Sequence, residues 1–155
     1  MSLSADSREF IELLNSHAVE YVLVGAHSVA FHATPRYTGD VDILVRPTAE
    51  NADRIVAALT EFGFGSLGLE RSDFLTPDQV IQLGRAPNRI DLLTGLSGVS
   101  VADCFTTKIE AEFDGIRIAV VSREVLLRNK RATGRPQDLA DVAAIEAATD
   151  PSAES

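Results

Sequence analysis

The sequence predicts an α/β (α+β) fold in which a mixed, twisted sheet of about five strands is covered by helices. Short apolar runs alternate with amphipathic segments in the first half of the chain. Two later apolar runs flank a short turn, which predicts a β-hairpin, and two amphipathic segments follow, which predict two C-terminal helices. With 155 residues, 45% of them hydrophobic, the chain can form one core. We therefore assign residues 1–150 to a single domain and expect residues 151–155 to form a disordered tail.

The elements of the first half follow from local patterns. Residues 6–16 have apolar side chains at helical spacing, with Ser4 or Asp6 as the expected N-cap. The apolar run 21–24 ends at a glycine and predicts a buried strand, and residues 26–33 predict a helix closed by Thr-Pro. The sequences that follow predict a second strand at 41–45 and an amphipathic helix at 49–62.

The second half begins with residues 65–78, which predict a loop with short pieces of structure. Residues 80–83 and 89–93 predict the two strands of a hairpin. Residues 116–121 predict the last strand. The two final helices are expected at 122–131, capped by Ser122, and at 136–148, where a proline suits the first turn.

Charge and composition limit the class of partner. The formal net charge of −9 would repel a phosphate backbone, so generic DNA binding is not expected. No apolar run approaches the ~18 residues that span a bilayer, and no signal peptide is visible, so we expect no membrane association and a cytoplasmic location. Five of the 14 Lys and Arg residues lie within 123–135, which indicates either a local anion site or a solvated helix face.

The most informative stretch is the segment 40–45, DVDILV. Residues two apart on a strand share a face, so Asp40 and Asp42 point the same way while apolar residues anchor the other face. Carboxylates ~6 Å apart on such a strand repel by roughly 3 kcal/mol at an effective dielectric of about 20. Something must offset that repulsion. An isolated Asp-x-Asp pair is also common at solvent-facing strand edges, so its context decides.

A second apolar strand carries Asp91 in the middle of its run. If it lies near the first, the carboxylates of Asp40, Asp42 and Asp91 converge on one patch. Ligands that are all oxygen suit Mg²⁺ or Mn²⁺. Two such ions can stabilise the attacking and leaving oxygens of a phosphoryl transfer.

A glycine turn precedes the aspartates. Gly25 lies where a strand runs into a helix, and glycine there permits a tight turn and close approach of a ligand. Free amides at a helix N-terminus favour phosphate. The same junction is also a common structural turn.

The order of these parts resembles the DNA polymerase beta-like nucleotidyltransferase superfamily: Gly25, Ser28, eleven intervening residues, the Asp-hydrophobic-Asp pair, and Asp91 on a later strand. Arg36 and Thr38 are similar to an Arg-x-Thr found in nucleotidyltransferases of bacterial abortive-infection and toxin–antitoxin systems and in uncharacterised stand-alone relatives.

The resemblance continues through the last helices. Residues 127–142, with Lys130, Arg135, Asp138 and Asp141, look like the closing lysine and Arg-x-x-Asp-x-x-Asp of those families. The match covers roughly residues 21–148. Ala26 departs from it, because the superfamily usually has Gly or Ser there.

The resemblance implies the nucleotidyltransferase fold and a metal-dependent reaction. A nucleoside monophosphate would move from a nucleoside triphosphate to a hydroxyl of a small molecule, a protein or an RNA end, with release of pyrophosphate. Asp40, Asp42 and Asp91 would hold Mg²⁺ or Mn²⁺, and Asp91 would help deprotonate the acceptor. The implied nucleotide-binding residues are Gly25, Ala26, Ser28, Arg36, Thr38, Lys130 and Arg135. Arg135 could instead pair with Asp138. We expect Asp138 and Asp141 to orient Lys130 or Arg135 rather than to bind metal.

Two other functions remain open. The chain could be a nucleotide- or metal-binding module without turnover, or one component of a toxin–antitoxin-like pair, and the altered Ala26 supports this. A homodimer or a partner protein could complete its site. It could also be a plain structural α/β domain, in which neither Asp40 nor Asp42 affects function.

Overall fold

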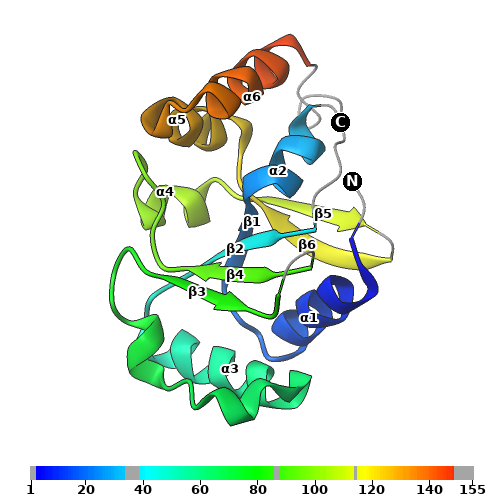
Figure 1. The fold of residues 1–155 in the computed structure, drawn as a ribbon, viewed down its shortest axis with the longest axis vertical. Coiled ribbons are helices and arrows are strands. Elements are labelled where there is room, and N and C mark those ends of the chain that lie inside the picture. The colour runs from blue at the N-terminus through cyan, green and yellow to red at the C-terminus, as the bar shows by residue number, and fades with distance from the viewer. Residues whose placement is uncertain (1–2, 34–38, 86–87, 114, 149–155) are drawn as a thin grey trace.

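A six-stranded mixed sheet forms the centre of the molecule (Figure 1). The structure is a computed structural model that describes residues 3–33, 39–85, 88–113 and 115–148. The strands are β1 (Tyr21–Val24), β2 (Val41–Val45), β3 (Val80–Leu83), β4 (Ile90–Leu93), β5 (Ile109–Phe113) and β6 (Ile116–Val120). Their order in the sheet is β3-β4-β2-β1-β6-β5. The β2–β4 and β1–β6 pairs are parallel, and the β1–β2 pair and both hairpins are antiparallel.

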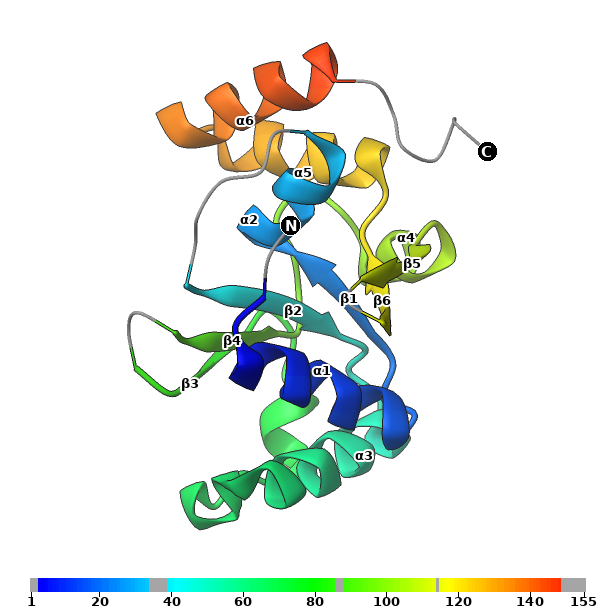
Figure 2. The ribbon, with the colours of Figure 1, turned by 90° about the vertical axis from the view of Figure 1, so that its right-hand side faces the viewer.

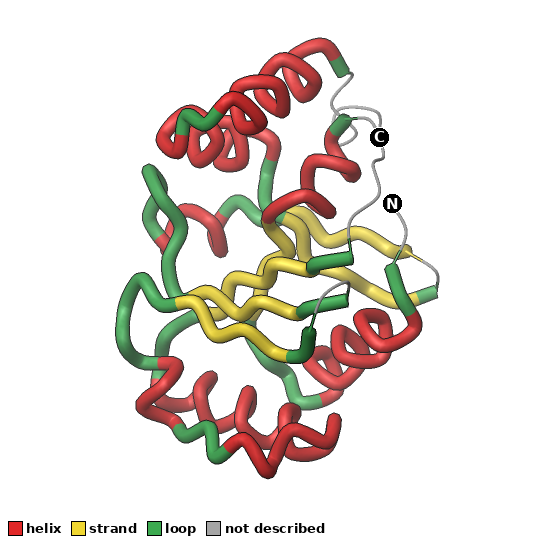
Figure 3. Tube along the Cα trace, in the orientation of Figure 1, coloured by secondary structure: helices red, strands yellow, loops and turns green. Residues whose placement is uncertain are grey.

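Helices cover both faces of this sheet (Figures 2 and 3). The α-helices are α1 (Ala5–Ser16), α2 (Gly25–His32), α3 (Ala49–Leu59), α4 (Val101–Thr106), α5 (Arg123–Thr133) and α6 (Pro136–Ala147). After α3 come a π-helical turn, η1 (Thr60–Phe64), and two 3-10 turns, η2 (Gly65–Leu67) and η3 (Arg71–Phe74). One buried apolar cluster joins α1 and α3 to one face of the sheet, and a second joins α2, α4, α5 and α6 to the other. Because successive strand residues face opposite ways, Ile43 enters the first cluster while Leu44 enters the second.

Side-chain caps start the helices where the sequence supplies a hydroxyl. Ser4, rather than Asp6, caps α1 by accepting a hydrogen bond from the amide of Ser7 at 3.1 Å. Ser122 caps α5 in the same way through the amide of Val125 at 3.3 Å. These bonds satisfy backbone donors that the first helical turn leaves unpaired.

The predicted fold class is confirmed, with one extra strand and one extra helix. β5 makes the sheet six-stranded, and its alternating burial places Ile109, Ala111 and Phe113 inward between exposed glutamates. The short helix α4 is capped by Ser100, whose hydroxyl accepts from the amide of Asp103 at 3.0 Å. Both elements are short, at five residues for β5 and six for α4, so each gives only a brief periodic signal. Among the described helices, none is both long and apolar enough to cross a bilayer, and the predicted tail lies outside the described residues.

Asn51 fastens the end of the sheet that lies away from the aspartates. This side chain is buried, its Oδ1 accepts from the amide of Glu20 at 2.7 Å, and its Nδ2 donates to the carbonyls of Glu20 and Arg46 at 3.0 and 2.9 Å. One amide group thus ties the chain before β1 to the chain after β2. That contact holds the two central strands in register with α3.

We expect Asn51→Ala to lower the free energy of unfolding by roughly 1–3 kcal/mol, because the amide of Glu20 loses its acceptor, while the carbonyls of Glu20 and Arg46 keep their bonds from the amides of Arg46 and Thr48. Urea denaturation followed by circular dichroism measures the change. The matched control is Asn88→Ala, at an exposed position, which should change stability by less than about 0.5 kcal/mol. Equal effects of the two substitutions would contradict this role for Asn51.

Candidate active site

Two neighbouring strands place a pair of aspartates side by side. Asp42 of β2 is in parallel register with Asp91 of β4, and neighbouring strands lie about 4.8 Å apart. On its other side Asp42 pairs with Val24, the last residue of β1, which leads directly into α2. The aspartates and the glycine turn, which lie far apart in the sequence, therefore meet at one place.

Arg89 binds two of the three carboxylates, which the sequence analysis did not anticipate. Its Nε lies 2.8 Å from Asp91 Oδ1 and its second terminal nitrogen lies 3.1 Å from Asp91 Oδ2. That same nitrogen lies 3.4 Å from Asp40 Oδ2, and the backbone amide of Arg89 donates to Asp40 Oδ1 at 3.3 Å. The signal was available, because residues 89 and 91 share a face of the strand.

Asp42 is the carboxylate that these contacts compensate least. Burial, then the charge and hydrogen bonding of Asp91, then the charge of Asp40, raise the pKa of Asp42 to about 6, and the charge of Lys130 opposes the shift. Crowded carboxylates disfavour the charged form of one member, and Arg89 contacts Asp40 and Asp91 directly. The site is therefore strained unless it gains positive charge.

Gly25 is required by the position of Asp42. Its φ of 69° lies in the left-handed region, and a Cβ at this position would come within 2.9 Å of Asp42 Cβ and Cγ and closer still to Oδ2. α2 begins at Gly25, and no side chain caps it. The first-turn amides therefore lie beside the aspartates without a side-chain cap, an arrangement that suits an anion.

Four further residues were predicted to contact the nucleotide near this turn, and the structure describes two of them. Ser28 is fully buried, and its hydroxyl donates to the carbonyl of Gly25 at 2.6 Å, so here it braces the turn. Ala26 lies in the same first turn and is partly buried. Arg36 and Thr38 lie outside the described residues. Nucleotide contact by these four residues stays a prediction.

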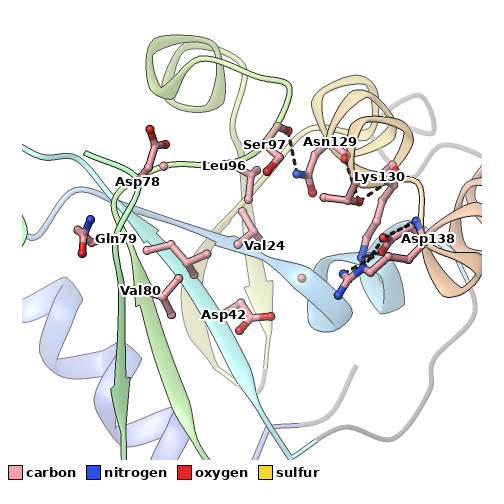
Figure 4. Close-up of a pocket in the computed structure, with 15 residues that line it drawn as sticks. Val24, Asp42, Asp78, Gln79, Val80, Leu96, Ser97, Asn129, Lys130 and Asp138 are labelled. Atoms are coloured by element: carbon pink, nitrogen blue, oxygen red, sulfur yellow. Dashed lines mark hydrogen bonds and ion pairs between the residues drawn. The ribbon is translucent and has the colours of Figure 1, made fainter. Parts of the chain in front are cut away.

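Lys130 is held on α5 by two aspartates of α6. Its Nζ lies 3.5 Å from Asp138 Oδ1 (Figure 4) and 3.3 Å from Asp141 Oδ2, and the residue is 8% exposed. Arg135 makes a two-point contact with Asp138, at 2.7 and 3.2 Å, which holds the pKa of that carboxyl far below its usual range. The alternative pairing expected for Arg135 is thus present. Both aspartates serve as partners of the basic residues.

A cavity of about 310 Å³ lies between the sheet and the closing helices (Figure 4). Its lining includes four of the predicted site residues: Gly25, Asp42, Lys130 and Arg135. Asp40 and Asp91 are not among the described residues that line it. The remaining lining residues are Val24, Asp78, Gln79, Val80, Leu93, Gly95, Leu96, Ser97, Asn129, Thr133 and Asp138.

Two of these lining residues show how the cavity wall is built. Asn129 Nδ2 donates to the carbonyl of Ser97 at 3.0 Å, which joins α5 to the loop after β4. No sequence motif indicated this contact, because it depends on how α5 packs.

The carboxylates supply the right ligand chemistry for a divalent cation. They offer only oxygen, which suits Mg²⁺ or Mn²⁺. Asp42 and Asp91 lie on neighbouring strands, and positive charge there would oppose the raised pKa of Asp42. As arranged, no three His, Cys, Asp or Glu side chains of the described residues are gathered closely enough to hold an ion. The donor set therefore fits the ion in chemistry, while Arg89 takes the place that positive charge would fill.

The chain has the fold of nucleotidyltransferases, as comparison with solved structures shows. It superposes on the lincosamide antibiotic adenylyltransferase LnuA, bound to lincomycin, with a TM-score of 0.60 and 14% identity, over 96% of this chain and 100% of that one. It aligns with a proposed nucleotidyltransferase from Thermotoga maritima with a TM-score of 0.61 and 19% identity, over 88% of each chain. The antibiotic-resistance factor ANT(2'')-Ia aligns with a TM-score of 0.56 and 10% identity, over 90% of this chain and 80% of that one. No protein-family model and no curated protein sequence matches the chain.

Gly25→Ala should destabilise the fold more than the same change at a glycine with the same backbone angle. Gly68 has a φ of 68° with nothing within 4 Å of an added Cβ, so Gly68→Ala measures the cost of the angle alone. We expect Gly25→Ala to exceed it by about 1–3 kcal/mol, because the methyl group would displace Asp42. Urea titration of both variants provides the comparison, and equal losses would contradict the close packing of Gly25 on Asp42.

Asp42→Asn should stabilise the protein at neutral pH in the presence of EDTA. The pKa of Asp42 is higher in the folded protein, at about 6, than its ordinary 3.8, so the folded state holds the proton more tightly. Stability is therefore lost as pH rises through this window, and the full penalty, roughly 2–3 kcal/mol, is present above about pH 6.

The asparagine variant lacks this penalty, so its advantage over the wild type should disappear near pH 4. Thermal melts between pH 4 and 8 measure the difference, with the exposed Asp6→Asn as control. A stability difference between wild type and Asp42→Asn that did not change with pH would refute the interpretation.

Proposed function

We propose that the protein is a metal-dependent nucleotidyltransferase that moves a nucleoside monophosphate from a nucleoside triphosphate to the hydroxyl of a small molecule and releases pyrophosphate. The observation that carries this proposal is the juxtaposition of Asp42 and Asp91, in register on parallel strands, with the N-terminus of α2 at Gly25. A nucleotidyltransferase fold without these residues would not support it, because fold alone does not define function.

Each group has a role that follows from its chemistry. The amides at the start of α2 bind phosphate oxygens, and Gly25 lets them approach closely. Lys130 lines the cavity and supplies positive charge to the triphosphate, while Asp138 and Asp141 orient its ammonium group.

The aspartates complete the reaction. Asp40, Asp42 and Asp91 would hold Mg²⁺ or Mn²⁺, which when bound neutralises charge that develops on the transferred phosphoryl group. Asp91 accepts the proton of the acceptor hydroxyl, which then attacks the α-phosphorus as the bond to pyrophosphate breaks. Most of the rate gain comes from positioning and charge stabilisation.

The acceptor proposed is a small molecule because the cavity is of small-molecule size and two fold neighbours were solved with such compounds. LnuA was solved with lincomycin, and ANT(2'')-Ia with adenylyl-2''-tobramycin. The cavity of about 310 Å³ lies at the lower end of the volumes typical of small-molecule sites.

Asp42→Asn and Asp91→Asn should each lower nucleotidyl transfer at least about 10²-fold, because each removes charge needed in the transition state. The measurement is transfer of α-phosphate label from each of the four common triphosphates to a panel of polyols and amino sugars, with pyrophosphate release followed in parallel. Asp6→Asn, exposed on α1, should retain activity. Full activity of Asp42→Asn would refute the mechanism.

A non-catalytic nucleotide-binding module is the second candidate, favoured by the engagement of Asp40 and Asp91 with Arg89. Calorimetric titration with Mg²⁺ and each triphosphate separates the two candidates. Binding without pyrophosphate release would favour the module.

A further inference from the structure

Among the described residues, Arg89 contacts two of the site's carboxylates directly. Both oxygens of Asp91 face its guanidinium group, at 2.8 and 3.1 Å, and one oxygen of Asp40 lies 3.4 Å away. Two parallel N–H···O bonds of this kind are the strongest geometry for an arginine–carboxylate pair. The two side chains can reach each other at these distances because Arg89 and Asp91 are two residues apart and lie on the same face of the strand.

A guanidinium group in this position competes with a divalent ion. Mg²⁺ needs carboxylate oxygens at about 2.0–2.1 Å, and both oxygens of Asp91 already accept hydrogen bonds from Arg89. Each oxygen keeps a second lone pair, so an ion at Asp91 would share the carboxylate with a guanidinium group of like charge. A divalent ion at Asp91 would also repel the guanidinium group strongly at such short range.

Departure of Arg89 from Asp91 is feasible because its side chain lies at the rim of the site. That side chain is 30% exposed, whereas the Asp91 side chain is 10% exposed. The guanidinium group can turn into solvent without becoming a buried unpaired charge, so its release avoids a large desolvation cost. The aspartates would then keep their positions, since the sheet holds them.

Resting on the proposed function, we propose that Arg89 is an internal counter-cation that neutralises Asp91 and Asp40 in the metal-free protein and leaves Asp91 when a divalent ion binds. This arrangement stabilises the empty site and lowers its affinity for the ion. The site therefore binds the ion by exchange of one cation for another.

The test is the affinity of the nucleotide-free, full-length chain for Mn²⁺, measured by calorimetry, with melting temperature in EDTA as a second readout. We expect Arg89→Gln to bind Mn²⁺ about tenfold or more tightly than the wild type, since it removes the competing charged hydrogen bonds. Its melting temperature in EDTA should fall, and Mn²⁺ should restore it. Arg89→Lys, which keeps the charge without the two-point geometry, should lie between the two.

The matched control is Arg85→Gln. Arg85 is exposed in the same hairpin, so this change alters net charge equally without touching the carboxylates. Its Mn²⁺ affinity should stay within about threefold of the wild type, because exposed charges are screened by salt.

Equal or weaker binding by Arg89→Gln would overturn the proposal and assign Arg89 a supporting role at Asp91. If the wild type transfers nucleotide while Arg89→Gln shows no gain in Mn²⁺ affinity, only this inference fails. If no transfer is found while Arg89→Gln gains an affinity that Asp91→Asn abolishes, the proposed reaction fails and the counter-cation role stands.

Discussion

The crowding of negative charge at Asp42 and Asp91 is the constraint to which the rest of the site responds. The parallel register of β2 and β4 sets their separation, and backbone hydrogen bonds along both strands hold that register. The carboxylates cannot relax apart without breaking the sheet. Positive charge must come to them instead, from Arg89 on one side and, at longer range, from Lys130 on the other. The pKa of Asp42 stays raised, by its burial first and then by Asp91 and Asp40, although the charge of Lys130 opposes the shift.

The core explains why a polar site can exist at the middle of a small sheet. The face that carries Asp42 and Asp91 also carries Val24 and Leu44, which pack under the closing helices. The opposite face is wholly apolar at the same strands and packs on α1 and α3. Burial of that second face anchors the strands, and the stability it supplies tolerates charged residues across the sheet.

The cavity wall depends on close contact between the loop after β4 and α5. Gly98, with a φ of 77°, leaves no room for a side chain against Ala132, so the loop lies directly on the helix. The bond from Asn129 to Ser97 closes the same contact. Lys130 is the next residue after Asn129 on α5. The contact of Asn129 with the loop after β4 therefore also helps to position the Lys130 ammonium group beside the cavity. One turn of α5 thus carries both the residue that holds the cavity wall and the residue that supplies positive charge.

Local periodicity in the sequence determined much of this protein. The shared face of Asp40 and Asp42, the glycine turn before α2, the hairpin of β3 and β4, and the two closing helices all follow from patterns within a dozen residues. The fold class follows from their order. The sequence did not predict β5 and α4 because elements of five and six residues are too short for a clear periodic signal.

Tertiary structure alone decided which charged groups meet. The engagement of Arg89 with Asp40 and the burial of the Ser28 hydroxyl required strand register and helix packing between distant segments. A sequence pattern specifies the face on which a side chain lies. The pattern does not specify which residue lies opposite on the neighbouring strand, because that depends on the register in which the two strands form hydrogen bonds.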